Sequence, residues 1–194
     1  SEGNATSSVM NFTVKLVLEW SYETGGDVDA VAISEDGEYI ATVSADNKVY
    51  LFKKDSNIPL WNYSTGGDAK TVSISADGEY IVAGSNDDKV YLFDKDSSTP
   101  LWSYETGGNV GSVAISMNGD YIVVGSNDDK VYLFGKDSST PLWSYDTSDN
   151  VALVAISADG KYIAVASSDD IYFFNKYSHD LIWNRELGST VRSV

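Results

Sequence analysis

The sequence predicts an all-β protein assembled from tandem four-stranded antiparallel units. Its five tryptophans, Trp20, Trp61, Trp102, Trp143 and Trp183, are spaced 41, 41, 41 and 40 residues apart. A Gly-x-Tyr-Ile pattern recurs in phase with them at 37–40, 78–81, 119–122 and 160–163. The decapeptide GSNDDKVYLF stands twice, at 84–93 and 125–134. Periods near 40 residues are typical of propeller blades or of helical repeats, so the composition of the unit must distinguish them.

One unit contains four candidate strands, in the order VGSVAIS (110–116), DYIVVGS (120–126), KVYLFGK (130–136) and LWSYDT (142–147). The first two strands meet at Asn118-Gly119, a dipeptide typical of tight hairpins whose primed turns need positive φ. Residues 127–129 form the second turn. Pro141, which cannot donate a ladder hydrogen bond, lies in the loop before the fourth strand. Four short strands without helical periodicity predict a blade of a β-propeller.

The first strands are apolar on both faces, as expected where each blade is covered by two neighbours. One face carries the large residues Val31, Ile33, Val72, Ile74, Val113, Ile115, Val154 and Ile156. The opposite face carries the small residues Ala32, Ser73, Ala114 and Ala155. Tyr-Leu-Phe or Tyr-Phe-Phe in each third strand supplies bulk farther from the axis. We therefore expect sheets that approach closely near the axis and diverge outward.

The repeat divides the chain into a lead, 1–15, that is flexible or partly stranded, and a propeller region, 16–194. Within that region complete blades are predicted at 28–65, 68–106, 109–147 and 150–187. Residues 16–26 are predicted as an isolated fourth strand, and 190–194 as the start of a further blade. Either the chain is a fragment of a larger propeller, or two copies associate through their open blade edges, because unpaired edges invite pairing.

The VAIS-x-DG-x-YI hairpin, the DxKVYLF third strand and the PLWSY fourth strand resemble the WD40-like and PQQ-like β-propeller repeats of prokaryotic surface proteins, archaeal ones included. The resemblance covers residues 16–194 and implies a propeller. Two departures matter. The Trp-Asp and Gly-His dipeptides of eukaryotic WD40 blades are absent, and the cofactor-holding residues of the quinone dehydrogenases cannot be mapped onto this chain. We therefore expect the tryptophans to pack between blades, with no cofactor.

The amino-acid composition excludes several kinds of functional site and partner. There is no cysteine, which excludes disulfides, thiolate metal sites and a cysteine nucleophile. The net charge of −16, from 29 acidic and 13 basic residues, repels phosphate backbones, so nucleic acid is not expected as a partner. No apolar run is long enough for a membrane-spanning helix, so no membrane insertion is expected. His179, the only histidine, is expected in a surface loop, which leaves no base for a nucleophilic triad.

Carboxylates recur in the turns between second and third strands, at Asp46, Asp87, Asp128 and Asp170 among others. Such oxygens suit hard cations such as calcium. Each turn, however, also has the sequence of an ordinary hairpin, and Lys48, Lys89 and Lys130 offset the charge in three of them. We favour turn chemistry, and predict no catalytic, cofactor-binding or metal-ligating residue. The chain is accordingly predicted not to be an enzyme.

The function predicted first is a non-enzymatic binding or scaffold module, extracellular or on the cell surface, whose rim loops contact a protein or glycan. Sequons at Asn4, Asn11 and Asn62 favour exposure outside the cell. The alternative is a sensor or accessory propeller domain of a larger enzyme or signalling protein, with the catalytic parts elsewhere. A propeller fold alone does not distinguish the two.

Overall fold

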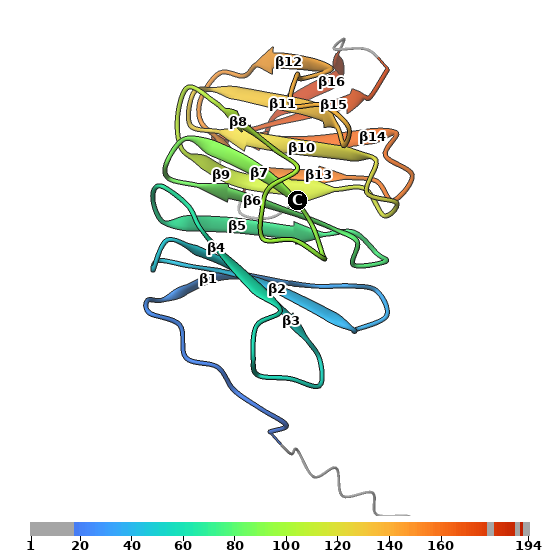
Figure 1. Cartoon of the computed structure of the whole chain (residues 1–194). Coiled ribbons are helices and arrows are strands. Elements are labelled where there is room, and N and C mark those ends of the chain that lie inside the picture. Colours follow the sequence, from blue (N-terminus) through green and yellow to red (C-terminus); the bar gives the residue numbers. More distant parts are fainter. Residues whose placement is uncertain (1–17, 178–180, 189–190, 192–194) are drawn as a thin grey trace, which may run out of the picture.

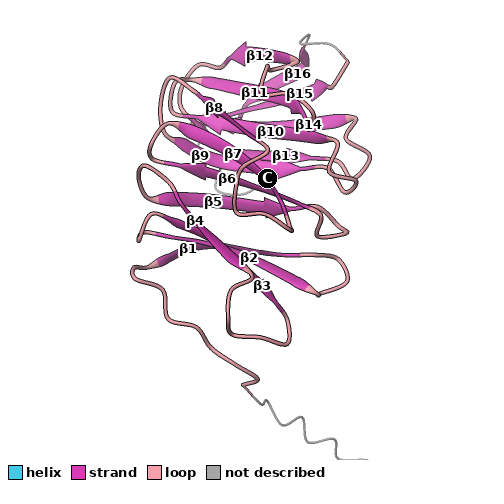
Figure 2. Cartoon of the chain, viewed as in Figure 1, coloured by secondary structure: helices cyan, strands magenta, loops and turns pink. Residues whose placement is uncertain are grey.

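The computed structural model describes residues 18–177, 181–188 and 191. These residues form only strands, turns and loops, and no helix occurs among them (Figure 2). The strands are β1 (Val28–Ile33), β2 (Tyr39–Ser44), β3 (Lys48–Lys53), β4 (Trp61–Ser64), β5 (Ala69–Ile74), β6 (Tyr80–Ser85), β7 (Lys89–Asp94), β8 (Trp102–Glu105), β9 (Val110–Ile115), β10 (Tyr121–Ser126), β11 (Lys130–Gly135), β12 (Trp143–Asp146), β13 (Val151–Ile156), β14 (Tyr162–Ser167), β15 (Asp170–Asn175) and β16 (Leu181–Glu186).

Each run of four consecutive strands forms one antiparallel sheet in sequence order, which confirms the predicted all-β propeller repeat. We call the sheets blades 1 to 4. They are stacked in chain order, with blades 1 and 4 at opposite ends (Figure 1). The first strand of each blade packs against the first strand of the next. We call the side that a blade turns toward the following blade its leading face, and the opposite side its trailing face.

The strands lie inside the predicted blades. In blade 3, where strand bounds are predicted, β9, β11 and β12 end one residue earlier than expected and β10 ends as expected. Residues 18–24 belong to no strand, although a fourth strand is predicted there. They pack on blade 1 through Trp20 and Tyr22, whose rings lie 5.5 and 5.1 Å from that of Phe52. Among the described residues, no strand pairs with this segment. Residues 1–17 and most of 190–194 are outside the described ranges, so the predictions for them stay open.

The turns between first and second strands differ from the primed hairpins that the sequence suggests. In blade 1 the Gly37 amide donates to the Ser34 carbonyl at 2.9 Å, and φ is positive at Gly37 but not at Asp36. Asp36 instead accepts a hydrogen bond from the Ser34 hydroxyl. The other blades repeat this arrangement, with positive φ at Gly78, Gly119 and Gly160. The glycine is required, but as the last residue of a β-turn rather than within a two-residue loop.

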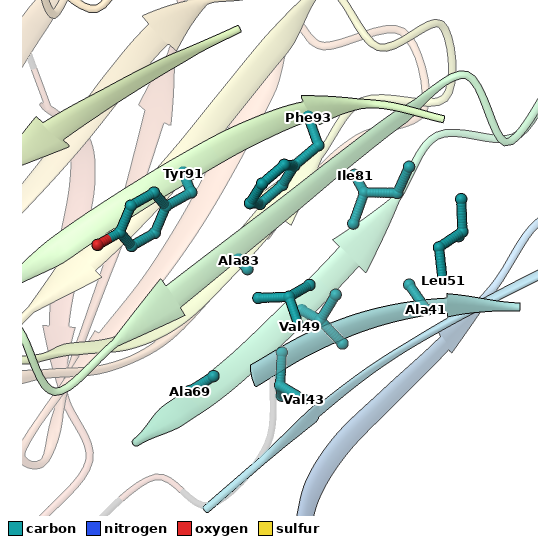
Figure 3. Packing of buried hydrophobic residues seen from close by; sticks show 10 residues of the cluster. Ala41, Val43, Val49, Leu51, Ala69, Ile81, Ala83, Tyr91 and Phe93 are labelled. Atoms are coloured by element: carbon teal, nitrogen blue, oxygen red, sulfur yellow. The ribbon is translucent and has the colours of Figure 1, made fainter. Parts of the chain in front are cut away.

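The core lies between neighbouring sheets. At the first junction, the buried cluster consists of Ala41, Val43, Val49 and Leu51 from blade 1 and Ala69, Val72, Ile81, Ala83, Tyr91 and Phe93 from blade 2 (Figure 3). Ala30 and Ala32, from the small face of β1, pack against it. Equivalent clusters fill the other two junctions. The predicted contrast between a small face and a large face is thus confirmed.

Side-chain size is matched across the junctions at one position that recurs in each of them. The residues that face each other there are Val43 and Ala69 at the first junction, Gly84 and Val110 at the second, and Gly125 and Val151 at the third. A β-carbon on Gly125 would stand only 2.5 Å from Cγ1 of Val151. At the second and third junctions the leading face therefore carries glycine and the trailing face carries valine. At the first junction the larger residue, valine, is on the leading face, and the smaller one, alanine, is on the trailing face.

The tryptophans join blades at the outer side of the stack. Trp61 packs on Phe93 of the next blade at 5.2 Å between ring centroids, and its Nε1 donates to the Lys95 carbonyl at 2.7 Å. Trp102 and Trp143 make the equivalent hydrogen bonds at 2.7 and 3.0 Å. The predicted role of the tryptophans in inter-blade packing is confirmed for Trp61, Trp102 and Trp143. Trp183 differs, because it stacks on Phe173 of its own blade and is exposed.

Candidate binding surfaces

The acidic turns between second and third strands tie neighbouring blades together. Asp87 Oδ2 accepts hydrogen bonds from the Tyr91 hydroxyl at 2.5 Å and from the Gly66 amide at 2.6 Å. Gly66 lies in the connection that leaves blade 1, so this one carboxylate joins two blades. The same ties recur for Asp46 with Tyr50 and Gly25, and for Asp128 with Tyr132 and Gly107.

In blade 4 the turn is one residue shorter, and Asp170 Oδ2 accepts from the Ser148 hydroxyl at 2.9 Å and from the Tyr172 hydroxyl at 3.3 Å. All four carboxylates therefore serve the turns and the blade junctions, as the sequence favours. Among the described residues, no three or more His, Cys, Asp or Glu side chains gather in a group that could hold a metal ion.

The tyrosines of these ties are held in their protonated form. Burial, and then the hydrogen bond to Asp87, raises the pKa of Tyr91 well above its ordinary value. Burial alone would raise the pKa of Asp46, but the hydrogen bonds from Tyr50 and Gly25 outweigh it and the pKa falls below its ordinary value. The phenols of Tyr50, Tyr91 and Tyr132 thus keep their protons at neutral pH, and the carboxylate of Asp46 keeps its charge. The pair is a structural tie and not a proton-transfer couple.

Acids at the other rim close their own turns. Asp36 Oδ1 accepts from the Ser34 hydroxyl at 2.6 Å and from the Glu38 amide at 2.9 Å, and these two hydrogen bonds lower the pKa of Asp36. For Asp159, hydrogen bonds from the Ser157 hydroxyl and then from Lys161 lower the pKa to about 2. The charged carboxylate is therefore the form that the folded turns prefer.

We expect stability to fall in acid because of these turns. A carboxyl group whose pKa is lower in the folded than in the unfolded state stabilises fully above its unfolded pKa of about 3.9, and loses that contribution as pH falls through its folded pKa. The melting temperature should therefore be level above about pH 5 and decline toward about pH 2. Circular dichroism melts across this range would measure it.

Asp159→Asn provides the matched control, because blade 3 already carries Asn118 at the equivalent position, where it accepts from the Ser116 hydroxyl at 2.8 Å. The variant should melt close to the wild type at pH 7 and lose less stability in acid. An unchanged acid slope would contradict the role assigned to Asp159.

The outer side of the rim carries a row of apolar side chains that the sequence reasoning missed. Leu60, Leu101, Leu142 and Ile182 are all exposed and each directly precedes the tryptophan of its fourth strand. We call them the leucine row. The repeated Leu-Trp dipeptide could have revealed these residues. In a strand covered on both faces, however, the leucine before the tryptophan is expected to be buried on the opposite face.

A hollow of about 460 Å³ lies beside Leu142. Its lining residues are Asp120, Tyr121, Gly135, Lys136, Asp137, Ser138 and Leu142. Lys136 pairs with Asp120 at 3.0 Å, and Lys176 lies over the Tyr121 ring at 3.7 Å from its centroid. An apolar side chain flanked by an aromatic ring and by charges of both signs is a combination suited to a polypeptide ligand.

A second depression, of about 380 Å³, lies among the turns between first and second strands and is lined by Glu35, Asp36, Ala76, Asp77 and Met117. Its carboxylates at Asp36 and Asp77 already accept hydrogen bonds from Ser34 and Ser75. Of the residues singled out in the sequence, Asn62 is exposed on β4, whereas His179, Asn4 and Asn11 lie outside the described ranges.

Comparison with known proteins identifies the family. The family model described as outer membrane protein assembly factor BamB, a PQQ-type repeat model, matches residues 13–152. The chain therefore belongs to this PQQ-like β-propeller family. A search of the curated proteins found no match. Within the described ranges, no helix has the length and apolar character needed to cross a bilayer.

Proposed function

We propose that the protein is a non-catalytic propeller module that binds a partner protein along its leucine row, at the cell surface or elsewhere outside the cytoplasm. The observation that carries the proposal is the recurrence of an exposed leucine or isoleucine at the same position of each blade. Isolated exposed apolar residues need no explanation, but a regular set flanked by polar loops is typical of a protein-binding surface.

The arrangement of the acids supports a binding rather than a catalytic role. A catalytic pair needs two groups that converge on one reacting atom, whereas the turn carboxylates are spread over the blades and each accepts hydrogen bonds within its own turn. The proposed location draws support from the three sequons and from the family, whose model is named for an outer membrane protein assembly factor.

The proposal can be tested by selecting ligands from a random peptide display library on the wild-type protein. The net charge of −16 favours peptides that combine apolar residues with lysine or arginine. Peptides so selected should lose about tenfold or more in affinity for the double variant Leu101→Asp/Leu142→Asp, measured by fluorescence anisotropy.

The matched control is Thr99→Asp/Thr140→Asp. Both threonines are exposed, lie two residues before the leucines and receive the same added charge. This variant should keep its affinity within about twofold, because only the charge and not the apolar contact has changed. Equal losses in both variants, or binding by glycans alone on an array, would overturn the assignment of a protein ligand to the leucine row.

A further inference from the structure

Both end faces of the described stack carry exposed apolar side chains. On the trailing face of blade 1, Val31 is 66% exposed, whereas its equivalent in blade 2, Val72, is 8% exposed at a junction. Val28 and Ile33 are exposed beside Val31. On the leading face of blade 4, Trp183 and Tyr162 are exposed. The ends therefore present side chains of the kind that every internal junction buries.

The two end faces are the complementary halves of the interface that the protein already forms three times. Blade 4 presents Leu153, Ala155, Ala164, Ala166, Ile171 and Phe173 where blade 1 presents Ala30, Ala32, Ala41, Val43, Val49 and Leu51. Ala166, at the size-matched position, is fully buried within one copy, and the Val191 amide donates to the carbonyl of nearby Ser168 at 3.1 Å. Val28 of a second copy would reach Ala166 only after Val191 had left, and the pair would then repeat the combination of Val43 with Ala69 with the sides exchanged.

Backbone groups at the two ends are complementary as well. A relay of amide donors runs along one rim, from Glu35 to Ala76 at 2.9 Å, from Ala76 to Met117 at 2.9 Å and from Met117 to Ala158 at 3.1 Å. Among the described residues, the Ala158 amide has no acceptor and the Glu35 carbonyl no donor. Contact between blade 4 and a second blade 1 would join these two groups and continue the relay.

Residues 18–24 occupy part of the same site. Trp20 Nε1 donates to the Lys54 carbonyl as Trp61 does to Lys95, and Gly25 donates to Asp46 at 2.8 Å as Gly66 does to Asp87. The segment thus takes the place of the outer strand of a preceding blade, and leaves Val28, Val31 and Ile33 uncovered. A second copy could place Trp183 on Phe52 only if Trp20 left.

The positive charge of Arg185 favours replacement of residues 18–24 by a second copy. Arg185 of β16 stands at the position that other blades give to Tyr63, Tyr104 and Tyr145. Those tyrosines pack against the tyrosine of the next blade that bonds the turn aspartate, as Tyr63 does with Tyr91 at 5.4 Å. In a docked copy Arg185 would face Tyr50 and Asp46, which adds an attraction between opposite charges in an otherwise acidic protein.

We propose that the protein self-associates head to tail, the leading face of blade 4 of one copy docking on the trailing face of blade 1 of another, in competition with residues 18–24. The contact is heterologous, because it joins two different surfaces, and it leaves each copy with one further face to offer. This interaction is independent of the leucine row, which lies on the outer side of the rim.

Sedimentation velocity from about 1 to about 100 µM tests the proposal with two equivalent tryptophans. Trp20→Ala weakens the competing segment, so association should tighten about tenfold, whereas Trp183→Ala removes part of the docking face, so association should weaken about tenfold. General stickiness of apolar surface would move both variants in the same direction. That result, or a Trp20→Ala protein that stays monomeric at the highest concentration, would overturn the proposal.

A mixing experiment identifies the two surfaces. Val31→Asp blocks one face and Trp183→Asp the other, so each variant alone should be monomeric. Mixed in equal amounts they should form a heterodimer, because each supplies the face that the other has lost. Leu101→Asp/Leu142→Asp should associate as the wild type does. A failure of self-association can therefore be distinguished from a failure of ligand binding at the leucine row. Absence of the heterodimer, or loss of association in that control, would contradict the head-to-tail contact.

Discussion

Replacing Gly125 with valine is expected to lower the free energy of unfolding by about 3 kcal/mol. The new β-carbon would stand 2.5 Å from Cγ1 of Val151 and 3.1 Å from Cγ1 of Val154, and both valines are buried in the junction between blades 3 and 4. Neither neighbour can withdraw without moving a sheet, because both are held in the β13 ladder. Urea unfolding followed by tryptophan fluorescence would measure the loss.

The compensating change is Val151→Ala, which alone should cost about 2 kcal/mol through the cavity that it leaves. The double variant recreates the residue types that the first junction holds in Val43 and Ala69. Its destabilisation should be smaller than the sum of the single effects by at least about 1 kcal/mol, since residues in contact are coupled. Strict additivity would show that bulk is not matched across the junctions as we describe.

Phe174→Ala is expected to cost about 3–5 kcal/mol. Phe174 is fully buried in the junction between blades 3 and 4. Its ring lies 5.5 Å from Trp143 and 5.0 Å from Tyr145, which belong to the preceding blade. Truncation therefore removes contacts on both sides of the junction at once. Denaturant unfolding at low protein concentration is the appropriate measurement.

Phe173 is the matched control, because it has the same side chain one position earlier on β15. It lies on the leading face of blade 4, stacked between Tyr162 at 5.6 Å and Trp183 at 5.4 Å, and no sheet of the described residues packs on that face. We expect Phe173→Ala to cost about 1–2 kcal/mol, since only part of the side chain is buried. Similar costs at both positions would contradict the placement of the core between sheets.

Much of the fold could be predicted because the same strand and turn pattern recurs in every repeat of the sequence. The phase of tryptophan and Gly-x-Tyr-Ile gave four strands per unit and their order, and the contrast between Ala32 and Val31 separated the two faces of β1. The type of turn could not be predicted in the same way. Asp-Gly suits several turns, and the choice depends on the Ser34 hydroxyl, which binds Asp36.

The candidate surfaces were harder to predict than the core. A fourth strand is predicted at residues 16–26 because the sequence matches the other fourth strands. Residues 18–26 form no strand, because no other strand of the described chain pairs with them. The ties from Asp87 to Tyr91 and Gly66 join residues 4 and 21 positions apart, so no local pattern reveals them. The exposure of Leu101 likewise depends on where the sheet ends.

The unequal bulk at the first junction also bears on how the chain assembles. Blades 2 and 3 share most of their sequence, so a folding chain could dock blade 3 directly on blade 1 and skip the blade between them, an error characteristic of repeat proteins. That arrangement would set Val43 against Val110, two β-branched side chains where the correct partner, Ala69, leaves room. The Val43–Ala69 pair is therefore expected to disfavour docking of blade 3 on blade 1, and to favour the order in which the blades follow one another in the sequence.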